Sequence, residues 1–336
     1  MRTVTRHPRL VDVASRAGVS EGTASKALNG TGQLRAETRE RVLRAAADLG
    51  FSPHGLARGL SSGRSYTVGL ITTDSFGRFS LPVMLGVEDA LGAGEMAVLL
   101  CDTRDDPLRE RHYLRTLVAR RVDGLIIAGR RAEPRPAIDV PESIPTVYVF
   151  QPAVGEQTTS VLADDEAGAR MAVQHLLALG RSTVAHITGP ADHLTAQLRA
   201  KSAIQALTSA GATVVDEPQF GEWSERWGRL AVASLLRCRP EIDAIVCGSD
   251  QIARGVCDGA REAGIRVPQD IAVVGFDNWD VMALACRPPL TSVDLELQRL
   301  GREAAQLLLD AISGQPRPGI HRVAPRLVIR ESTVGQ

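Results

Sequence analysis

The sequence predicts a small all-α amino-terminal domain followed by a larger α/β body made of two similar lobes. Two short helical segments flank a glycine near the amino terminus, and from Ser65 onward short apolar runs alternate with helical stretches. The chain has 336 residues, which exceeds one ordinary domain, so two or three folded units are expected. A hydrophobic content of 44% is ample for large cores.

The segment "RLVDVASRAGVSEGTASKALN" predicts two helices joined by a tight turn. Apolar residues recur at helical spacing from Leu10 to Ala17, and Gly18 tolerates the positive φ that ends a helix. Ser20 is a natural N-cap for a second helix, which is expected to run to about Asn29. This arrangement is a helix-turn-helix, whose second helix enters the major groove of DNA.

A third helix is expected over "AETRERVLRAAADLGF", with Val42, Leu43, Ala46 and Leu49 on its inner face and Gly50 at its end. The charge of this region favours contact with phosphates. The first 64 residues hold eleven Arg or Lys against five Asp or Glu, a balance of +6, whereas the remaining 28 basic and 34 acidic residues give −6. A basic segment on an acidic body indicates a domain that binds nucleic acid.

The composition argues against membrane, secreted and catalytic classes of protein. No run of about 18 apolar residues is present, and the amino terminus lacks the apolar region of a secretory signal. Five cysteines without CxxC spacing indicate buried reduced thiols, and the histidines lack metal-ligand spacing. The sequence contains no GxSxG, HExxH, Walker A or GxGxxG motif. We therefore expect a cytoplasmic protein that is not an enzyme and has no metal or other cofactor.

Seven apolar runs in the body have the length of β-strands. They are "YTVGLIT", "MAVLLCDT", "VDGLIIAG", "PTVYVF", "STVAHITG", "DAIVCGSD" and "IAVVGFDN". Runs this continuous predict strands covered on both faces and hence parallel sheets. Because the rhythm restarts near Val161, two similar lobes are expected. Ligands of open α/β lobes bind beyond the carboxyl ends of the strands, here between the lobes.

The order "VDVASRAGVSEGTASKALN" and then "TRERVLRAAADLGFSPHGLARGL" resembles the lac repressor/galactose repressor (LacI/GalR) family of bacterial transcription regulators. The resemblance extends to about Arg330 and implies a periplasmic-binding-protein-like core of two Rossmann-like lobes with three crossovers. It implies a DNA-binding domain at 1–53, a hinge helix or linker at 54–64 and an effector-binding core at 65–336. The N-lobe then takes about 65–162 plus 294–322, and the C-lobe about 163–293 plus 323–331.

The resemblance also implies which residues contact DNA. At the base-reading positions Glu21 can accept from cytosine N4, Gly22 reads nothing, and Lys26 can donate to guanine O6 or N7, so an operator unlike those of the best-known members is expected. In the hinge, Leu60 is placed as the wedge that opens a minor-groove step, with Ala57 one turn earlier; a flexible linker is the alternative. The full set is Ser20, Glu21, Gly22, Thr23, Ser25, Lys26, Asn29, Ala57 and Leu60.

Six residues of the body are implied to bind the effector: Asp74, Phe79, Arg199, Trp223, Ser249 and Asp277. Trp223 lies in "GEWS", close to the "GDWS" of lactose-type regulators, and its ring is expected to stack on a sugar face. Asp277 is expected to accept from ligand hydroxyls, and Ser249 stands where most relatives have Asn. Structural alternatives are a solvated charge for Arg199, a core aromatic for Trp223, a turn cap for Asp277 and a lid residue for Phe79, while Asp74 fits either role.

Together these observations predict a sequence-specific DNA-binding repressor of carbohydrate-utilisation genes that a sugar-type effector releases. A homodimer on a pseudo-palindromic operator is expected, because two-fold protein symmetry requires two-fold DNA. A corepressor-dependent regulator that responds to a nucleoside, a purine or a sugar phosphate is the alternative. An enzyme would leave the helix-turn-helix without a role, and an exported sugar-binding protein would not carry residues 9–63.

Overall fold

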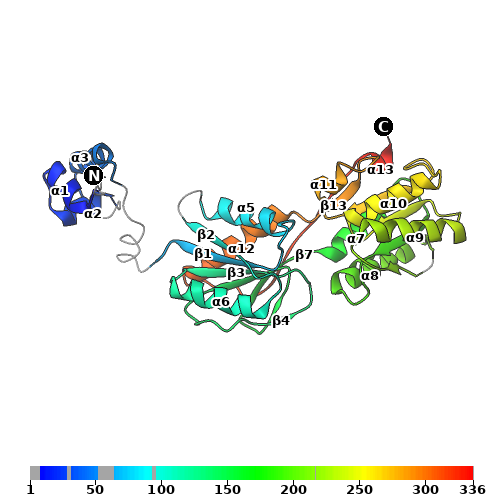
Figure 1. Cartoon of the computed structure of the whole chain (residues 1–336), viewed down its shortest axis with the longest axis horizontal. Helices are drawn as coiled ribbons and strands as arrows, with labels where there is room; N and C mark the ends of the chain where they lie inside the picture. The colour runs from blue at the N-terminus through cyan, green and yellow to red at the C-terminus, as the bar shows by residue number, and fades with distance from the viewer. Residues whose placement is uncertain (1–7, 29–31, 52–63, 93–95, 216, 336) are drawn as a thin grey trace, which may run out of the picture. The chain divides into compact units, whose positions relative to one another are not determined.

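The computed structural model describes residues 8–28, 32–51, 64–92, 96–215 and 217–335 of the chain. These residues form two compact units, the first holding the amino-terminal helices and the second holding nearly all of the body (Figure 1). Three of the residues implied to contact DNA, Asn29, Ala57 and Leu60, lie outside the described residues.

The first unit is built from three helices, which are α1 (Leu10–Ala17), α2 (Glu21–Leu28) and α3 (Ala36–Leu49). Their ends follow the local sequence signals. Gly18 and Gly50 adopt left-handed conformations, with φ of 64° and 62°, directly after α1 and α3. The hydroxyl of Ser20 accepts from the backbone N–H of Thr23 at 3.2 Å, which confirms the predicted N-cap of α2.

The core of the first unit is small and consists mostly of alanine. Its buried residues are Val13, Ala14, Ala17, Ala24, Ala27, Val42, Ala45 and Ala46. The prediction that Leu43 faces inward is wrong, because 47% of it is exposed and Ala45 is buried instead. The inner face of α3 is formed by Val42 and by Ala45 and Ala46, three and four residues later. Leu43 is one residue further along the helix than Val42, so it points away from this face.

The first lobe of the body, the N-lobe, is one sheet covered by helices. Its strands are β1 (Thr67–Thr72), β2 (Ala97–Asp102), β3 (Gly124–Ala128), β5 (Thr146–Val149), β7 (Thr159–Ala163) and β14 (Gly319–Val323), in the order β14-β7-β5-β3-β1-β2. The helices α5 (Ser80–Ala90) and α12 (Leu297–Ile312) pack together on one face, and α6 (Pro107–Ala119) lies on the other (Figure 1). The short strands β4 (Arg135–Pro136) and β6 (Ala153–Val154) form a separate pair.

The second lobe, the C-lobe, repeats this plan. Its strands are β8 (Thr183–Thr188), β9 (Thr213–Val214), β10 (Gln219–Phe220), β11 (Ala244–Cys247), β12 (Ala272–Phe276), β13 (Thr291–Asp294) and β15 (Arg326–Val328). The sheet order is β10-β8-β11-β12-β13-β15, with β9 beside β8, and β15 alone is antiparallel to its neighbour among the described pairs. Its helices are α7 (Asp165–Ala178), α8 (Leu194–Ser209), α9 (Glu225–Cys238), α10 (Asp250–Glu262), α11 (Asp280–Ala283) and α13 (Glu331–Val334).

Both faces of the C-lobe sheet are covered, as the continuous apolar runs predict. In β8, Val184 packs into a cluster with residues of α7 and α8, whereas Ala185 and Ile187 pack with residues of α9 and α10. This alternation follows from the two-residue period of a strand. The seven predicted strands are present, but β7, β13 and β14 carry weaker apolar signals and were not among them. The chain passes between the lobes after β7, β13 and β14.

Glycines allow two pairs of helices to cross at backbone distance. A Cβ added at Gly86 or Gly301 would lie 1.9 or 2.1 Å from a carbonyl oxygen of the facing helix in the α5–α12 pair. In the α9–α10 pair, a Cβ added at Gly228 or Gly255 would lie 2.1 or 2.0 Å from a carbonyl oxygen of the facing helix. Only glycine fits these four positions, so each lobe has one tightly fixed helix pair.

The helices of the described chain lack the combined length and apolar character that crossing a bilayer requires. Of the five free cysteines, Cys247, Cys257 and Cys286 are buried as expected. The same expectation is wrong for Cys101, which is half-buried, and for Cys238, which is exposed.

Candidate DNA-binding and effector-binding sites

The helix α2 divides into a buried side and an exposed side. Its two alanines, Ala24 and Ala27, lie in the core of the first unit. Of the residues implied to contact DNA, Ser20, Glu21, Gly22 and Lys26 are exposed, and Thr23 and Ser25 are half-buried. The described part of the predicted set therefore lies on the side of α2 that the core leaves open.

Two hydrogen bonds hold the turn before α2 and join α1 to α3 in the first unit. The N–H of Val19 donates to the carbonyl of Ala14 at 3.0 Å, closing the turn after α1. The guanidinium of Arg41, on α3, donates to the carbonyl of Ala17 at 2.9 Å and ties α3 to the end of α1. These bonds fix the turn from which α2 starts.

In the C-lobe, Arg199 is the centre of a buried polar network. Only 5% of this residue of α8 is exposed, so the alternative of a solvated charge is wrong. Its guanidinium donates to Asp165 at 2.8 Å and to the carbonyl of Gly248 at 2.6 Å, and it lies 3.4 Å from a carboxylate oxygen of Asp277. Its carbon lies 3.7 Å from the ring centroid of Phe276, a cation–π distance.

Asp277 joins this network to the N-lobe. It follows β12 and is buried, with a positive φ of 100° that a residue with a side chain rarely adopts. One of its carboxylate oxygens accepts from Arg199 and the other accepts from the guanidinium of Arg78, which belongs to the N-lobe. Arg78 also donates to the side-chain oxygen of Gln251, on α10, at 3.0 Å.

Aromatic rings from both lobes flank the Arg78 guanidinium. Its carbon lies 4.8 Å from the ring centroid of Phe79 and 4.6 Å from that of Trp279. The ring of Phe79 in turn meets Phe150 edge to face, with centroids 5.9 Å apart. We call Arg78, Arg199, Gln251 and Asp277, with the rings of Phe79 and Trp279, the inter-lobe cluster.

Two acids beside the inter-lobe cluster, Asp165 and Asp250, have perturbed ionisation. Burial raises the pKa of Asp165, although the neighbouring Arg199 opposes the shift. Burial and the nearby carboxylate of Asp277 raise the pKa of Asp250 to about 7. The carboxyl of Asp250 accepts from the hydroxyl of Ser292 at 2.5 Å and from the N–H of Trp279 at 2.6 Å, so Asp250 is structural.

Two predicted effector residues use their side chains to cap helices. One carboxylate oxygen of Asp74 accepts from the backbone N–H groups of Phe79 and Ser80, at 2.7 and 2.9 Å, at the start of α5. The hydroxyl of Ser249 accepts from the N–H of Ile252 at 3.3 Å, at the start of α10. Phe79 itself lies beside Arg78 in the inter-lobe cluster.

Trp223 lies at the carboxyl end of the C-lobe sheet but outside the inter-lobe cluster as defined. Its indole N–H donates to Nδ1 of His193 at 3.0 Å. Its ring packs on Gly189, directly after β8, where an added Cβ would lie 2.2 Å from a ring carbon. Trp223 also contacts the buried cluster between the sheet and α9, so part of its surface is core.

Several buried polar atoms near this junction have no hydrogen-bond partner within the described part of the chain. They are Thr73 Oγ1, Arg78 Nε, Glu133 Oε2, both ring nitrogens of His186, and Thr188 Oγ1. Thr73 follows β1, and His186 and Thr188 lie near the end of β8. Burial, together with the charge of Arg199, lowers the pKa of His186 to about 4, so its ring is neutral near pH 7.

Sequence reasoning missed Arg78, Gln251, Trp279, Glu133 and Phe150. Arg78 is separated in sequence from its partners Asp277 and Gln251 by 199 and 173 residues. No local sequence pattern can therefore predict these contacts. Glu133 also spans the lobes, since its carboxylate accepts from the N–H of Leu194 at 2.8 Å. Trp279 was within reach of prediction, because it lies two residues after Asp277 at a strand end.

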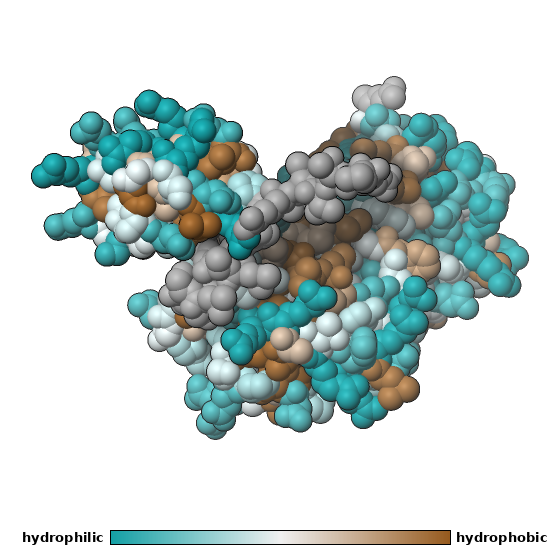
Figure 2. Space-filling view, turned by 60° about the vertical axis from the view of Figure 1, so that its left-hand side comes forward, coloured by the Kyte–Doolittle hydropathy of each residue, from teal (hydrophilic) through white to brown (hydrophobic). Residues whose placement is uncertain are grey.

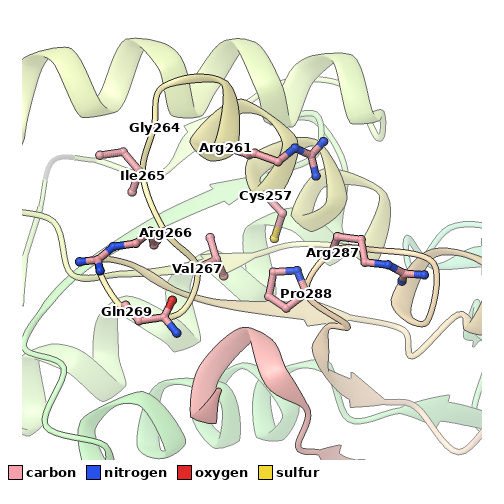
Figure 3. A pocket seen from close by; sticks show the side chains of 9 residues that line it. All are labelled: Cys257, Arg261, Gly264, Ile265, Arg266, Val267, Gln269, Arg287 and Pro288. Atoms are coloured by element: carbon pink, nitrogen blue, oxygen red, sulfur yellow. The ribbon is translucent and has the colours of Figure 1, made fainter. Parts of the chain in front are cut away.

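A cavity of about 420 Å³ lies elsewhere on the C-lobe, lined by Cys257, Arg261, Gly264, Ile265, Arg266, Val267, Gln269, Arg287 and Pro288 (Figure 3). None of the six predicted effector residues lines it. Two of its arginines, Arg261 and Arg266, are paired with Asp258 and Asp270 at 2.6 Å each. We place the candidate effector site at the inter-lobe cluster instead, because buried polar groups from both lobes converge there.

Comparison with known proteins agrees with this architecture. Residues 9–54 match the model of "Bacterial regulatory proteins, lacI family", and residues 173–333 match a "Periplasmic binding protein-like domain". The chain is 34% identical to the HTH-type transcriptional regulator CelR of Thermobifida fusca, over 97% of this chain and 98% of that protein. Among solved structures, a CelR–cellobiose complex is similar with a TM-score of 0.67 and 31% identity, covering 97% and 99% of the two chains. A lac repressor dimer bound to operator and the anti-inducer ONPF has a TM-score of 0.76 and 27% identity, covering 98% and 100%.

A helix-turn-helix unit joined to a two-lobed α/β body with a polar cluster between its lobes defines a DNA-binding transcription regulator. The chain belongs to the lacI family of bacterial regulatory proteins. The family predicted from the amino-terminal motifs and the predicted fold class are both confirmed.

Proposed function

We propose that this chain is a repressor whose first 53 residues bind operator DNA, with residues 54–64 as the hinge and residues 65–336 as the effector-binding core. Within the core, we assign about 65–162 plus 294–322 to the N-lobe and about 163–293 plus 323–331 to the C-lobe. The ends of β7 at Ala163, β13 at Asp294 and β14 at Val323 move each boundary by one residue. Ser20, Thr23 and Ser25 contact phosphates in this proposal, Glu21 and Lys26 read base edges, and Gly22 lets α2 approach the groove closely. Asn29, Ala57 and Leu60 complete the surface, with Leu60 as the minor-groove wedge.

The effector of this proposal is a neutral sugar bound at the inter-lobe cluster. The observation that carries it is the set of buried polar atoms without partners, drawn from the N-lobe and the C-lobe alike. Buried donors and acceptors normally find partners, so unpartnered atoms in both lobes favour a polar ligand between them. The rings of Phe79, Trp279 and Trp223 offer apolar faces to a pyranose. The relative solved with cellobiose supports the same ligand class.

Charge favours a neutral ligand over a sugar phosphate. The two arginines of the inter-lobe cluster, Arg78 and Arg199, already pair with the carboxylates of Asp165 and Asp277. A phosphate would add about two negative charges beside these acids, whose charges already balance those of the two arginines. A nucleoside satisfies the same charge condition and remains the second candidate, since its base also offers a flat face.

The proposed assembly is a homodimer formed through the body. Large apolar side chains are exposed on the N-lobe, in the loop before α5, on α5 and on β2, and on the C-lobe at α11 and the residue after it. They are Phe76, Leu81, Leu85, Leu100, Val281 and Leu284. Figure 2 shows apolar (brown) residues gathered in a recess of the two-lobed unit, with hydrophilic (teal) residues around them. Exposed apolar side chains of this kind favour association with a second copy.

In the proposed mechanism, effector binding changes the angle between the N-lobes of the dimer and so the separation of the two hinges. The effector must bind the two arrangements with different affinity, since equal affinity would shift nothing. Induction by a sugar follows if the DNA-free arrangement binds it better. The protein acts in the cytoplasm, where its DNA is, and has no catalytic activity in this proposal.

Gel-shift titration of the full chain with DNA from upstream of its own gene tests the DNA-binding part. Binding to a discrete fragment is expected, with an affinity that falls steeply as salt rises because phosphate contacts release counterions. Thermal-shift screening with cellobiose, other sugars, nucleosides and glucose 6-phosphate tests the effector part. Binding of nucleosides alone would favour the second candidate, and failure to bind any fragment at low salt would remove the regulatory assignment.

A further inference from the structure

The arginine of the inter-lobe cluster that comes from the N-lobe occupies an unusual position. Arg78 lies in the loop between β1 and α5, after a turn in which Gly77 has a positive φ of 73° and donates to the carbonyl of Asp74 at 3.2 Å. From this loop the guanidinium reaches the other lobe, where it contacts Asp277 and Gln251. One side chain thus joins the two lobes at the place proposed for the effector.

The surroundings of Arg78 are those of a bound ligand rather than of a surface ion pair. Its side chain is 14% exposed, and one ring from each lobe, Phe79 and Trp279, lies within cation–π distance of its guanidinium. Its Nε is buried without a partner in the described part of the chain. Burial of a charge with an unmet donor costs stability that the ion pair only partly offsets. Stability alone therefore gives no reason for this arrangement.

The contacts of Arg78 also use the groups expected to bind the effector. The two carboxylate oxygens of Asp277 both accept from arginines, one from Arg199 within the C-lobe and one from Arg78. The side-chain oxygen of Gln251 is likewise engaged by Arg78. Asp277 holds this position with a strained backbone, which is a mark of functional sites.

We propose that Arg78 is a tethered competitor of the effector: in the ligand-free chain its guanidinium occupies the effector's place, and the effector must displace it from Asp277. The inference rests on the proposed function, since it concerns the same site. The displacing ligand must donate hydrogen bonds to Asp277 and Gln251 and present an apolar face to Phe79 or Trp279. A sugar with adjacent hydroxyls on one edge and C–H groups on one face meets these conditions.

This device sets the effector concentration at which the protein responds. Without it, the effector would bind to free acceptors; with it, the free energy of the Arg78 contacts opposes binding. Loss of the guanidinium should therefore tighten effector binding by at least about fivefold, the lower end of common coupling factors. A direct contact between Arg78 and the effector would have the opposite effect.

The first experiment needs no effector. The full-length Arg78→Ala variant removes the guanidinium and leaves its place empty, and ethylguanidinium chloride at about 20 mM, far below denaturing concentrations, serves as the probe. We expect the probe to raise the Tm of Arg78→Ala by at least about 2 °C more than that of the unmodified chain. Ethylammonium, which is charged but not planar, should have a smaller effect. The control is Arg109→Ala, which removes an exposed guanidinium of α6 that pairs with Asp106 at 3.8 Å.

The second experiment measures the affinity of the unmodified chain, Arg78→Met and Arg109→Ala for each sugar or nucleoside that raises the Tm of the unmodified chain. Arg78→Met keeps the volume of the stem, so if the alanine variant does not fold, the first experiment uses Arg78→Met with guanidinium chloride at about 20 mM, a probe without the ethyl group. Tighter binding by Arg78→Met alone is the expected result.

Two results would overturn the proposal. One is an equal response of Arg78→Ala and Arg109→Ala to ethylguanidinium, because the place would then not be built for a guanidinium. The other is weaker ligand binding by Arg78→Met, because Arg78 would then be an effector contact. If no sugar or nucleoside binds the unmodified chain, the proposed effector class fails and competition by Arg78 fails with it, while the ethylguanidinium result still shows whether the place beside Asp277 is built for a guanidinium.

Discussion

The two lobes share a fold but contribute to the inter-lobe cluster in different ways. The C-lobe supplies Arg199 from within α8 and Asp277 from the end of β12; both are buried, and Asp165 of the same lobe pairs with Arg199. The N-lobe supplies one loop, residues 73–79, whose charged group Arg78 finds its partners across the junction. The difference suggests a division of labour in which the C-lobe holds the ligand and the N-lobe loop responds to it.

The largest effect is expected from breaking the C-lobe network at Arg199. Arg199→Met removes the cation that pairs with Asp165 and Asp277 and leaves buried carboxylates without it, which should cost about 3–5 kcal/mol of unfolding free energy. Urea unfolding measures this cost. Arg226→Met, on the exposed side of α9 in the same lobe, should change stability by less than about 0.5 kcal/mol. Equal costs for the two variants would mean that the C-lobe network is not preformed.

A second large effect concerns pH and Asp250. The pKa of Asp250 is about 7 in the folded chain, above the ordinary 3.8, so the folded state binds the proton more tightly than the unfolded state. Stability from this group is therefore greatest at low pH and is lost as pH rises from about 4 to about 7, by about 1.4 kcal/mol per pH unit. The lowered pKa of His186 contributes an opposite slope below about pH 6.5, so Asp250→Asn is tested by difference: its unfolding free energy should change with pH more positively than that of the unmodified chain between pH 5 and 7.

The matched control for the pH effect has the opposite shift. Hydrogen bonds from Arg266 lower the pKa of Asp270 to about 2, so this exposed group stays ionised between pH 5 and 7. Asp270→Asn should leave the slope in that range unchanged. If the pH dependence of the unfolding free energy is the same in Asp250→Asn as in the unmodified chain, a group other than Asp250 causes it.

The sequence predicted the parts of the molecule that local patterns determine and missed those that depend on contacts between distant segments. Helix ends at Gly18 and Gly50 and the cap at Ser20 follow from φ preferences and short-range hydrogen bonds. Asp277 and Arg199 were placed through a family motif, and both lie in the inter-lobe cluster. Arg78 was missed because nothing within its own loop distinguishes it from a solvated arginine.

An intermediate effect is expected where Trp223 packs on Gly189. Gly189→Ala places a Cβ 2.2 Å from the indole ring, so the ring must move, at a cost of about 1–3 kcal/mol. If Trp223 contacts the sugar, affinity should fall by about tenfold while operator affinity without effector is kept. The double variant Gly189→Ala/Trp223→Leu should recover most of the lost stability, because the overlap is gone. If Gly189→Ala binds the sugar as tightly as the unmodified chain, Trp223 does not contact the sugar and is a core residue.

The smallest effect separates the two roles open to Asp74 in the N-lobe loop. Its carboxylate caps α5 through the N–H groups of Phe79 and Ser80, so Asp74→Ala should cost about 1 kcal/mol of unfolding free energy. Asp74→Asn keeps an acceptor oxygen for these donors and should cost less, since asparagine is an equally good cap. If the loop only positions Phe79 and Arg78, sugar affinity of Asp74→Asn should match that of the unmodified chain. A loss of affinity at full stability would instead make Asp74 a ligand contact, and the N-lobe would then hold the effector as the C-lobe does.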